Sequence, residues 1–220
     1  MHFKDRFQAG QALASKLAAY QDRNDVQILA LPRGGVLVGY EVARLLHAPL
    51  DVLVVRKVGL PEYPELAIGA LAAGDVDRVS PAAVEQFHVS PEALQHVIDT
   101  ERTELYRREL CYRGGRPYPD VKSKIVILVD DGIATGLTMQ AAIISVQRHG
   151  PSRVVVAAPI GAADSCRELA RLADEVVCAS IPRNFDAVGA WYADFTQITD
   201  VEILTLLEQS ELQPTLQLES

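Results

Sequence analysis

The most informative chemical pattern in the sequence is a pair of adjacent carboxylates followed by a loop rich in glycine and threonine. Asp130 and Asp131 end an apolar run and precede Gly132, Ile133, Ala134, Thr135, Gly136, Leu137 and Thr138. Unpaired N–H groups at the start of a helix, at the positive end of its dipole, bind phosphate, and threonine hydroxyls add donors. The carboxylates would repel a phosphate but can accept hydrogen bonds from sugar hydroxyls. The pattern indicates a site for a ribose 5-phosphate, on a loop that we expect to face solvent.

A tight turn with two glycines forms a second candidate anion site. Arg33, Gly34 and Gly35 follow an earlier apolar run and stand directly before a predicted helix. Such a turn exposes N–H donors, and Arg33 adds a fixed positive charge. Arg56 and Lys57 follow the next apolar run. We therefore expect these three basic residues to lie at the ligand-binding edge of one sheet.

The elements that must position these residues alternate between strand and helix. Short, almost continuously apolar runs predict buried strands at residues 26–31, 50–55, 125–129, 154–158 and 176–179. Apolar spacing and turn residues predict helices at residues 5–20, 36–47, 90–111, 135–149 and 162–172. This alternation predicts an α/β fold, a doubly wound, mostly parallel sheet with helices on both faces. Ligands bind such sheets beyond the carboxyl ends of the strands, where both candidate loops lie.

The whole chain is expected to form a single domain over residues 1–220. Residues 58–120 are more than a minimal sheet requires, and we interpret them as a flap and helical insertion with a candidate strand pair around residues 66–79. Residues 210–220 are interpreted as an acidic tail. The loop that begins with Asp130 and Asp131, called the carboxylate loop below, therefore belongs to the part of the sheet that follows the insertion.

Residues 126–138 resemble the phosphoribosyl pyrophosphate (PRPP) signature of the type I phosphoribosyltransferases. In that family the two acidic residues hold the ribose 2- and 3-hydroxyls, and the following loop binds the 5-phosphate. The resemblance implies these roles for Asp130 and Asp131 and for residues 132–138. Residues 31–36 resemble the family's pyrophosphate-binding loop. Arg56 and Lys57 resemble an Arg-Lys pair that contacts pyrophosphate in the orotate branch of the family. The catalytic residues that the resemblance implies are therefore Arg33, Arg56 and Lys57.

The resemblance also implies a reaction, in which a nitrogen of a nucleobase or related acceptor displaces pyrophosphate from PRPP. The chain is then expected to be a glycosyltransferase (pentosyltransferase) of nucleotide salvage that uses Mg²⁺, bound mainly through PRPP. Ala134 stands where the hypoxanthine and xanthine-guanine branches carry an acidic residue, so the acceptor stays unassigned. Residues 181–197 correspond to the family's acceptor hood, in which Trp191 and Tyr192 are the candidates for base contact.

Two other functions stay open at this point. A non-catalytic PRPP-binding sensor or regulator with the same fold is the main alternative. A phosphoribosyl-dependent hydrolase or phosphorylase is a third interpretation. Dimerisation is common in the family, so a homodimer is also open. The chain carries neither a G-x-x-x-x-G-K-[ST] loop nor a G-x-G-x-x-G turn after a strand, which disfavours a nucleoside triphosphatase and a dinucleotide site.

The composition narrows the class of protein further. The chain has 220 residues, of which 49% are hydrophobic and 23% charged, as is typical of a globular protein. The net charge of −8 disfavours nucleic acid as a partner. Seven acidic and no basic residues follow Arg183, so this charge does not describe the candidate anion sites. The apolar runs are too short for a membrane span and no apolar signal core opens the chain, so we expect a cytoplasmic protein.

The three cysteines are Cys111, Cys166 and Cys178, which are far apart in the sequence and form no C-x-x-C pair. This spacing disfavours a disulfide framework and a zinc site. We therefore expect all three to be small core residues, and we assign no protein-bound metal with certainty.

Overall fold

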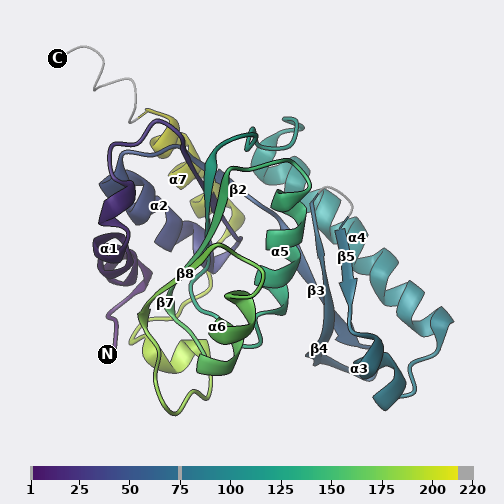
Figure 1. The fold of residues 1–220 in the computed structure, drawn as a ribbon. Coiled ribbons are helices and arrows are strands. Elements are labelled where there is room, and N and C mark those ends of the chain that lie inside the picture. The colour runs from purple at the N-terminus through teal and green to yellow at the C-terminus, as the bar shows by residue number, and fades with distance from the viewer. Residues whose placement is uncertain (1, 74–75, 213–220) are drawn as a thin grey trace.

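The computed structural model describes residues 2–73 and 76–212. Its central sheet has five parallel strands, and the prediction of a doubly wound α/β fold is confirmed (Figure 1). From one edge to the other, the strands are β2 (Leu50–Val52), β1 (Val26–Ala30), β6 (Ile125–Val129), β7 (Arg153–Ile160) and β8 (Glu175–Ser180). Helices α1 (Arg6–Lys16) and α2 (Gly34–Leu46) cover one face, and α5 (Leu137–Gln147) and α6 (Ala163–Leu169) cover the other.

Strand β6 shows why the strands appear in the sequence as continuous apolar runs. Its successive side chains point to opposite faces of the sheet, as in any strand. Val126 and Leu128 belong to the apolar cluster that includes α5 and α6, whereas Ile127 and Val129 belong to the cluster that includes α1 and α2. Because helices cover both faces, every residue of this strand is buried. The carboxyl end of β6 is thus held rigidly where the carboxylate loop begins.

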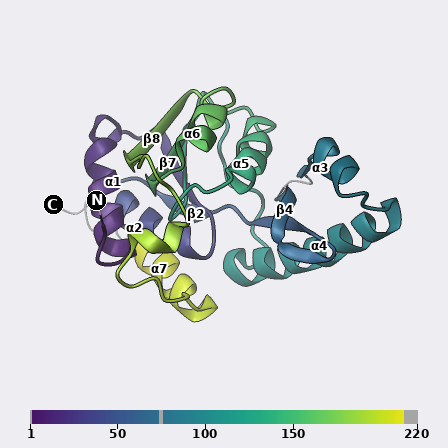
Figure 2. The ribbon, with the colours of Figure 1, turned by 90° about the horizontal axis from the view of Figure 1, so that it is seen from below.

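A second sheet forms the first part of the region that was predicted to be a flap and helical insertion. Strands β3 (Val55–Leu60), β4 (Tyr63–Ala72) and β5 (Val76–Val79) pair antiparallel, so the expected strand pair is present and has a third partner. Helices α3 (Pro81–Gln86) and α4 (Pro91–Arg113) follow, and α4 packs on β3 and β4. Figure 2 shows this unit projecting to one side of the central sheet. Helix α5 contacts both β4 and the central sheet, which joins the two layers.

The predicted strand at residues 50–55 is wrong in its extent. Strand β2 ends at Val52, and the chain enters β3 of the second sheet at Val55. The intervening Leu53 and Val54 are also buried. A run of buried apolar residues carries no mark of the point where the chain leaves one sheet for another, so the sequence pattern merged the two strands.

The C-terminal part of the chain returns to the carboxyl edge of the sheet. Residues 181–199 contain the short helix η2 (Val188–Trp191), and α7 (Asp200–Leu212) packs against α2 and α4. Another short helix, η1 (Ala18–Tyr20), follows α1. The first residues of the predicted acidic tail, 210–212, form the end of α7, and the rest lies outside the described residues. Of the helices in the described ranges, none has the length and apolarity needed to cross a bilayer.

Candidate active site

The two predicted anion-binding loops meet at the carboxyl ends of β1 and β6. These strands are neighbours, and the connections after them lead to opposite edges of the sheet, which makes this a topological switch point. The Leu31 N–H donates a hydrogen bond to the Val129 carbonyl oxygen (2.8 Å). A Cβ atom at Gly34 would overlap the Asp131 carboxylate, and one at Gly35 would lie 2.8 Å from the Val129 oxygen. Both glycines are therefore required for the close approach of the two loops.

The adjacent carboxylates are more buried than the sequence suggested. We expected a solvent-facing loop, but the Asp131 side chain is only 15% exposed and Asp130 is partly buried. Burial and the charge of Asp131 raise the pKa of Asp130 well above its usual range. Burial also raises the pKa of Asp131, and the neighbouring Arg6 guanidinium opposes that rise. The expectation was wrong because the N-terminal segment, far away in sequence, covers this loop.

Arg6 is the residue that covers and neutralises Asp131. Its Nε donates to Asp131 Oδ2 (2.8 Å), and its Nη1 donates to the Thr196 carbonyl oxygen (2.9 Å). The guanidinium also lies over the Phe195 ring, 3.9 Å from the ring centroid. Sequence reasoning missed Arg6, because its partner is 125 positions away and an arginine in a predicted surface helix carries no signal of such a contact. This one side chain connects α1, the carboxylate loop and the predicted hood.

The predicted phosphate loop has the geometry of a helix start. Gly136 precedes α5 with a φ of 76°, which a glycine adopts without the cost that a side chain would add. The first N–H groups of α5 have no intrahelical acceptor. Ala134 and Thr135 are exposed. The Ser165 hydroxyl donates to the Ala134 carbonyl oxygen (2.5 Å), so α6 supports the loop from behind.

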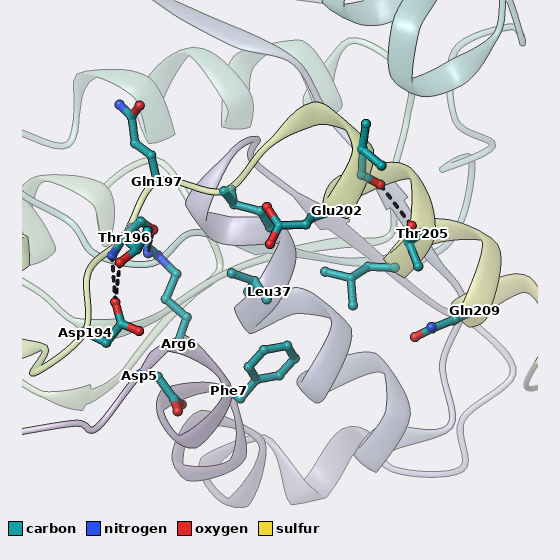
Figure 3. Close-up of a pocket in the computed structure, with 13 residues that line it drawn as sticks. Asp5, Arg6, Phe7, Leu37, Asp194, Thr196, Gln197, Glu202, Thr205 and Gln209 are labelled. Carbon is teal, nitrogen blue, oxygen red and sulfur yellow. Dashed lines mark hydrogen bonds between the residues drawn. The ribbon is translucent and has the colours of Figure 1, made fainter.

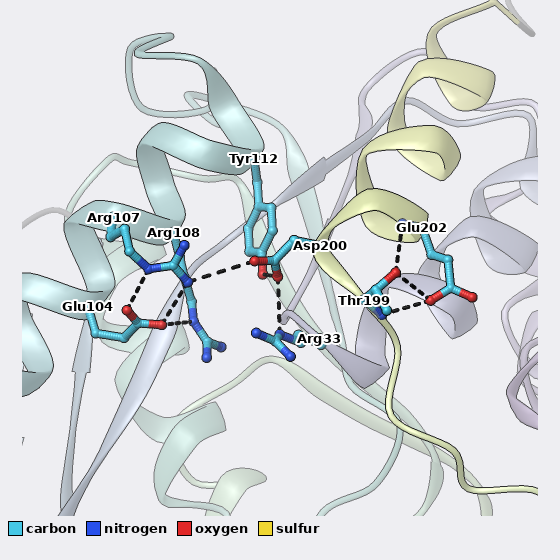
Figure 4. Close-up of polar contacts among 8 residues, drawn as sticks. All are labelled: Arg33, Glu104, Arg107, Arg108, Tyr112, Thr199, Asp200 and Glu202. Atoms are coloured by element: carbon cyan, nitrogen blue, oxygen red, sulfur yellow. Dashed lines mark hydrogen bonds and ion pairs between the residues drawn. The ribbon is translucent and has the colours of Figure 1, made fainter.

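Arg33 lies on the other side of the carboxylates and is held by the C-terminal helix. The peptide bond between Pro32 and Arg33 is cis. Arg33 Nε lies 3.2 Å from Asp200 Oδ1. This nitrogen atom is buried, but it makes no well-directed hydrogen bond. The Tyr112 hydroxyl donates to the same carboxylate oxygen (2.5 Å), and Arg107 Nη2 lies 3.8 Å from its other oxygen (Figure 4). Burial, then the bond to Asp200, raises the pKa of Tyr112 to about 12.

The start of α7 fixes the position of Asp200. The Thr199 N–H donates to Glu202 Oε2 (2.8 Å), and the Glu202 N–H donates back to the Thr199 hydroxyl (3.2 Å). This reciprocal pair is a capping box, also drawn in Figure 4. Asp200 therefore stands at a defined helix start, between Arg33 of the sheet edge and Tyr112 of α4. Sequence reasoning did not identify Asp200 or Tyr112, because neither belongs to a local motif.

A cavity of about 360 Å³ brings several of the predicted residues together with new ones. Its described lining consists of Arg6, Arg33, Gly34, Arg56, Arg108, Asp131, Phe195, Gln197 and Ile198. Four arginines and one carboxylate of the pair thus line the same cavity. Such a lining is suited to a ligand that carries several negative charges and hydroxyl groups, because guanidinium groups bind phosphate oxygens in a bidentate fashion.

Arg56 and Lys57 differ in their placement. We expected both in a loop after the second strand, but they lie within β3 of the antiparallel sheet, because the chain changes sheets at residues 53–54. Arg56 lines the cavity and also donates to Glu101 Oε2 (2.7 Å). Lys57 is the next residue of the strand, so its side chain leaves the opposite face, and it is not among the described residues of the cavity lining.

The predicted hood covers the carboxylate loop, and its aromatic rings have partners within the chain. The Tyr192 side chain is buried, and its hydroxyl donates to the Asp131 carbonyl oxygen (2.5 Å). The Trp191 ring stacks on the His2 ring, with centroids 5.0 Å apart. A Cβ atom at Gly132 would clash with the Val188 side chain, which shows how closely the hood approaches the loop. Both predicted base-contact residues are therefore engaged by segments outside the hood, the N-terminal segment and the carboxylate loop.

A larger cavity of about 420 Å³ adjoins the first and shares Arg6, Gln197 and Ile198 with it (Figure 3). It lies between α1, α2 and α7, where Phe7 and Leu37 contribute apolar surface. None of the described residues that line it comes from the loops at residues 32–35 and 130–138. The smaller, arginine-lined cavity is therefore the one to which both loops contribute, one through Arg33 and Gly34 and the other through Asp131.

Comparisons with known proteins agree with this geometry. The family model "Phosphoribosyl transferase domain" matches residues 2–194. Two Mycobacterium tuberculosis proteins named "Putative phosphoribosyl transferase", from strains CDC 1551 / Oshkosh and H37Rv, are each 44% identical over 208 residues. The matched region is 94% of this chain and 47% of each relative, so the chain spans about half the length of these curated relatives.

Solved structures share the fold. The TT1426 protein from Thermus thermophilus is 42% identical with a TM-score of 0.78, over 95% of this chain and 99% of that chain. The AQ2163 protein from Aquifex aeolicus, 14% identical with a TM-score of 0.50 over 84% of this chain and 78% of that chain, shares the fold alone. Together with the match of the family model, the sheet order and the two loops, these similarities show that the chain belongs to the phosphoribosyl transferase domain family and has the type I phosphoribosyltransferase fold.

Proposed function

We propose that this chain transfers the phosphoribosyl group of PRPP to a nitrogen acceptor and releases pyrophosphate. The observation that carries the proposal is the meeting of three features at one switch point of the sheet. These features are the Asp130 and Asp131 carboxylates, the N-terminus of α5 and the arginine-lined cavity. A sugar with a phosphate at one end and a diphosphate at the other carries groups complementary to all three.

Each feature has a proposed part in binding. Asp130 and Asp131 accept hydrogen bonds from the ribose 2- and 3-hydroxyls, because an ionised carboxylate is a pure acceptor. Residues 132–138 hold the 5-phosphate with the N–H groups at the start of α5. Arg33, Gly34 and Gly35 bind the diphosphate, and Arg56 contributes from β3. Lys57, on the other face of β3, stays a prediction for this role.

The proposed reaction breaks the bond between the anomeric carbon and the diphosphate oxygen and forms a bond to the acceptor nitrogen. Positive charge develops on the sugar ring, and negative charge develops on the leaving pyrophosphate. Arg33 and Arg56 stabilise the leaving group electrostatically and hold it in position. The acceptor nitrogen loses its proton in the course of the transfer. The chain thus contributes mainly orientation and charge.

Magnesium is the metal that this proposal involves. Among the described residues no three His, Cys, Asp or Glu side chains gather into a metal cluster. A Mg²⁺ ion that keeps several of its waters and is bound by diphosphate and hydroxyl oxygens does not need one. The Asp130 carboxylate is an oxygen donor of the kind that Mg²⁺ prefers and lies at the proposed sugar site. When bound, the ion would neutralise charge on the departing diphosphate.

In this proposal the hood contributes to the binding of the acceptor. Trp191 and Tyr192 have partners within the chain. The hood residues that border the arginine-lined cavity are Phe195 and Gln197, and Ile198, which directly follows the hood, borders it as well. The amide of Gln197 can donate and accept hydrogen bonds at the edge of a planar base. We propose that the acceptor enters along this border.

The test combines binding and turnover. Calorimetry should detect PRPP binding in the presence of Mg²⁺, and a panel of nucleobases and related amines should include one that supports pyrophosphate release. Asp130→Asn combined with Asp131→Asn should abolish both signals while the circular dichroism spectrum is kept. Arg23→Met, at a distant exposed ion pair, is the matched control. Unchanged PRPP affinity in the double variant would overturn the site assignment. Tight binding without turnover for any acceptor would favour a PRPP-binding regulator.

A further inference from the structure

Two of the three cysteines lie side by side behind the proposed phosphate loop. Cys166 belongs to α6 and Cys178 to β8, and their sulfur atoms are 3.6 Å apart. Both thiols are free. A disulfide has a sulfur–sulfur distance of about 2.05 Å, so a movement of roughly 1.5 Å would join them. The sequence disfavoured a disulfide framework, and the thiols are free in the structure, but the fold brings two cysteines that are twelve positions apart into contact.

The two sulfur atoms lie together against the backbone of one glycine, where no side chain separates them from it. The residue next to both sulfur atoms is Gly161, where a Cβ atom would lie 2.5 Å from Cys166 Sγ and 2.9 Å from Cys178 Sγ. Cys178 is only partly buried, because β8 is an edge strand of the sheet. Cys166 is 6% exposed. A small oxidant can therefore reach the pair from the open edge of β8.

The same segment supports the loop proposed to bind the 5-phosphate. Ser165, the neighbour of Cys166, donates its hydroxyl hydrogen bond to the Ala134 carbonyl oxygen (2.5 Å). Gly161 pairs with Ile133 in an isolated β-bridge. A Cβ atom placed on Gly136 would lie 3.6 Å from the side chain of Leu169, which belongs to α6. A movement of α6 toward β8 would therefore act directly on residues 133–136.

We propose that Cys166 and Cys178 form an oxidisable dithiol whose disulfide weakens phosphate binding at residues 132–138. The second half of this inference rests on the function proposed above, whereas the first half does not. The hydrogen bond between the two thiols lowers the pKa of Cys166, which favours its thiolate as the attacking group.

Hydrogen peroxide is the oxidant of this proposal. The Cys166 sulfur attacks one peroxide oxygen, the O–O bond breaks, and a sulfenic acid forms with release of water. The Cys178 sulfur then attacks the sulfenic sulfur, the S–O bond breaks, and a second water leaves with the disulfide formed. Two thiols and one peroxide thus give one disulfide and two waters. A reducing thiol reverses the change by exchange.

The first experiment measures the bond itself. In Cys111→Ala, the pair supplies the only thiols of the chain, and treatment of the folded protein with peroxide should remove both from thiol titration. Intact mass should fall by about 2 Da, peptide mapping should join residues 166 and 178, and dithiothreitol should restore both thiols. The matched control is Cys178→Ala, which keeps Cys166 and Cys111 and should form no internal disulfide. Two titratable thiols after treatment of Cys111→Ala would overturn the proposal.

The second experiment measures the effect on the loop. Oxidised Cys111→Ala should bind PRPP with Mg²⁺ roughly threefold to tenfold more weakly than the reduced form, about the effect of one lost hydrogen bond. Hydrogen exchange of peptides that cover residues 132–138 should change in parallel. Exchange that changes while neither form binds PRPP would refute the proposed function but keep the link between disulfide and loop. A disulfide that changes neither exchange nor affinity would refute that link.

Discussion

Removal of the Arg6 side chain should destabilise the protein more than loss of an ordinary ion pair. The Arg6 and Asp131 side chains are 8% and 15% exposed, and their closest atoms are 2.8 Å apart. Arg6→Met keeps much of the apolar volume but leaves the Asp131 charge partly buried beside Asp130. Loss of one partner of a buried pair costs about 3–5 kcal/mol. For a domain of this size, each kcal/mol lowers Tm by roughly 2–4 °C, so Tm should fall by roughly 6–20 °C.

The assay is thermal and urea unfolding of Arg6→Met, Asp131→Asn and the double variant. The double variant should recover much of the loss, because it no longer buries an unpaired charge, and the cycle then gives the coupling of the pair. Arg23→Met is the control, since its pair with Asp25 has side chains 46% and 41% exposed and its loss should leave the stability nearly unchanged. Equal losses for Arg6→Met and Arg23→Met would show that the pair of Arg6 with Asp131 stabilises the fold no more than an exposed ion pair does.

Three further predictions concern residues that line the arginine-lined cavity or neighbour its lining. The pKa of Asp130 is raised in the folded state, so its contribution to stability is present at low pH and is lost as pH rises from the unfolded to the folded pKa. Asp130→Asn should remove that loss of stability and raise the urea midpoint at pH 7. The same variant should weaken PRPP binding. Gly34→Ala should cost about 1–3 kcal/mol of stability in urea unfolding and should impair PRPP binding, because its Cβ overlaps the Asp131 carboxylate. Asp200→Asn should strengthen binding of inorganic pyrophosphate by about twofold to fivefold in calorimetry, because it releases Arg33 from a partly exposed ion pair.

The controls for these predictions come from the same elements. Glu208→Gln removes an exposed carboxylate from α7, the helix of Asp200, and should leave pyrophosphate affinity unchanged. A larger gain in affinity for Glu208→Gln than for Asp200→Asn would show that net charge alone is responsible. For Asp130→Asn, a urea midpoint at pH 7 below that of the original protein would contradict the assignment of an unfavourable buried charge. Full PRPP affinity in Gly34→Ala would show that the two loops can separate without consequence.

Local patterns predicted the central sheet well. Strand β6 was expected at residues 125–129 and has those bounds, because five apolar residues between polar ones have few other options. The expected start of the insertion helix at Ser90 and Pro91 is also confirmed, since the Ser90 hydroxyl accepts the hydrogen bond of the Ala93 N–H. The second sheet was only half anticipated, because nothing in its composition shows which strands pair.

The candidate site also combines features that are local in the sequence with contacts between distant segments. The order of carboxylates, glycines and threonines after β6 can be read from the sequence, since a loop between a strand and a helix is a local structure. The tertiary structure alone decided that Arg6 neutralises Asp131 and that Asp200 holds Arg33. It also decided that Cys166 meets Cys178. These contacts depend on the strand order and on where the chain ends return, and short-range apolar periodicity carries no information about either.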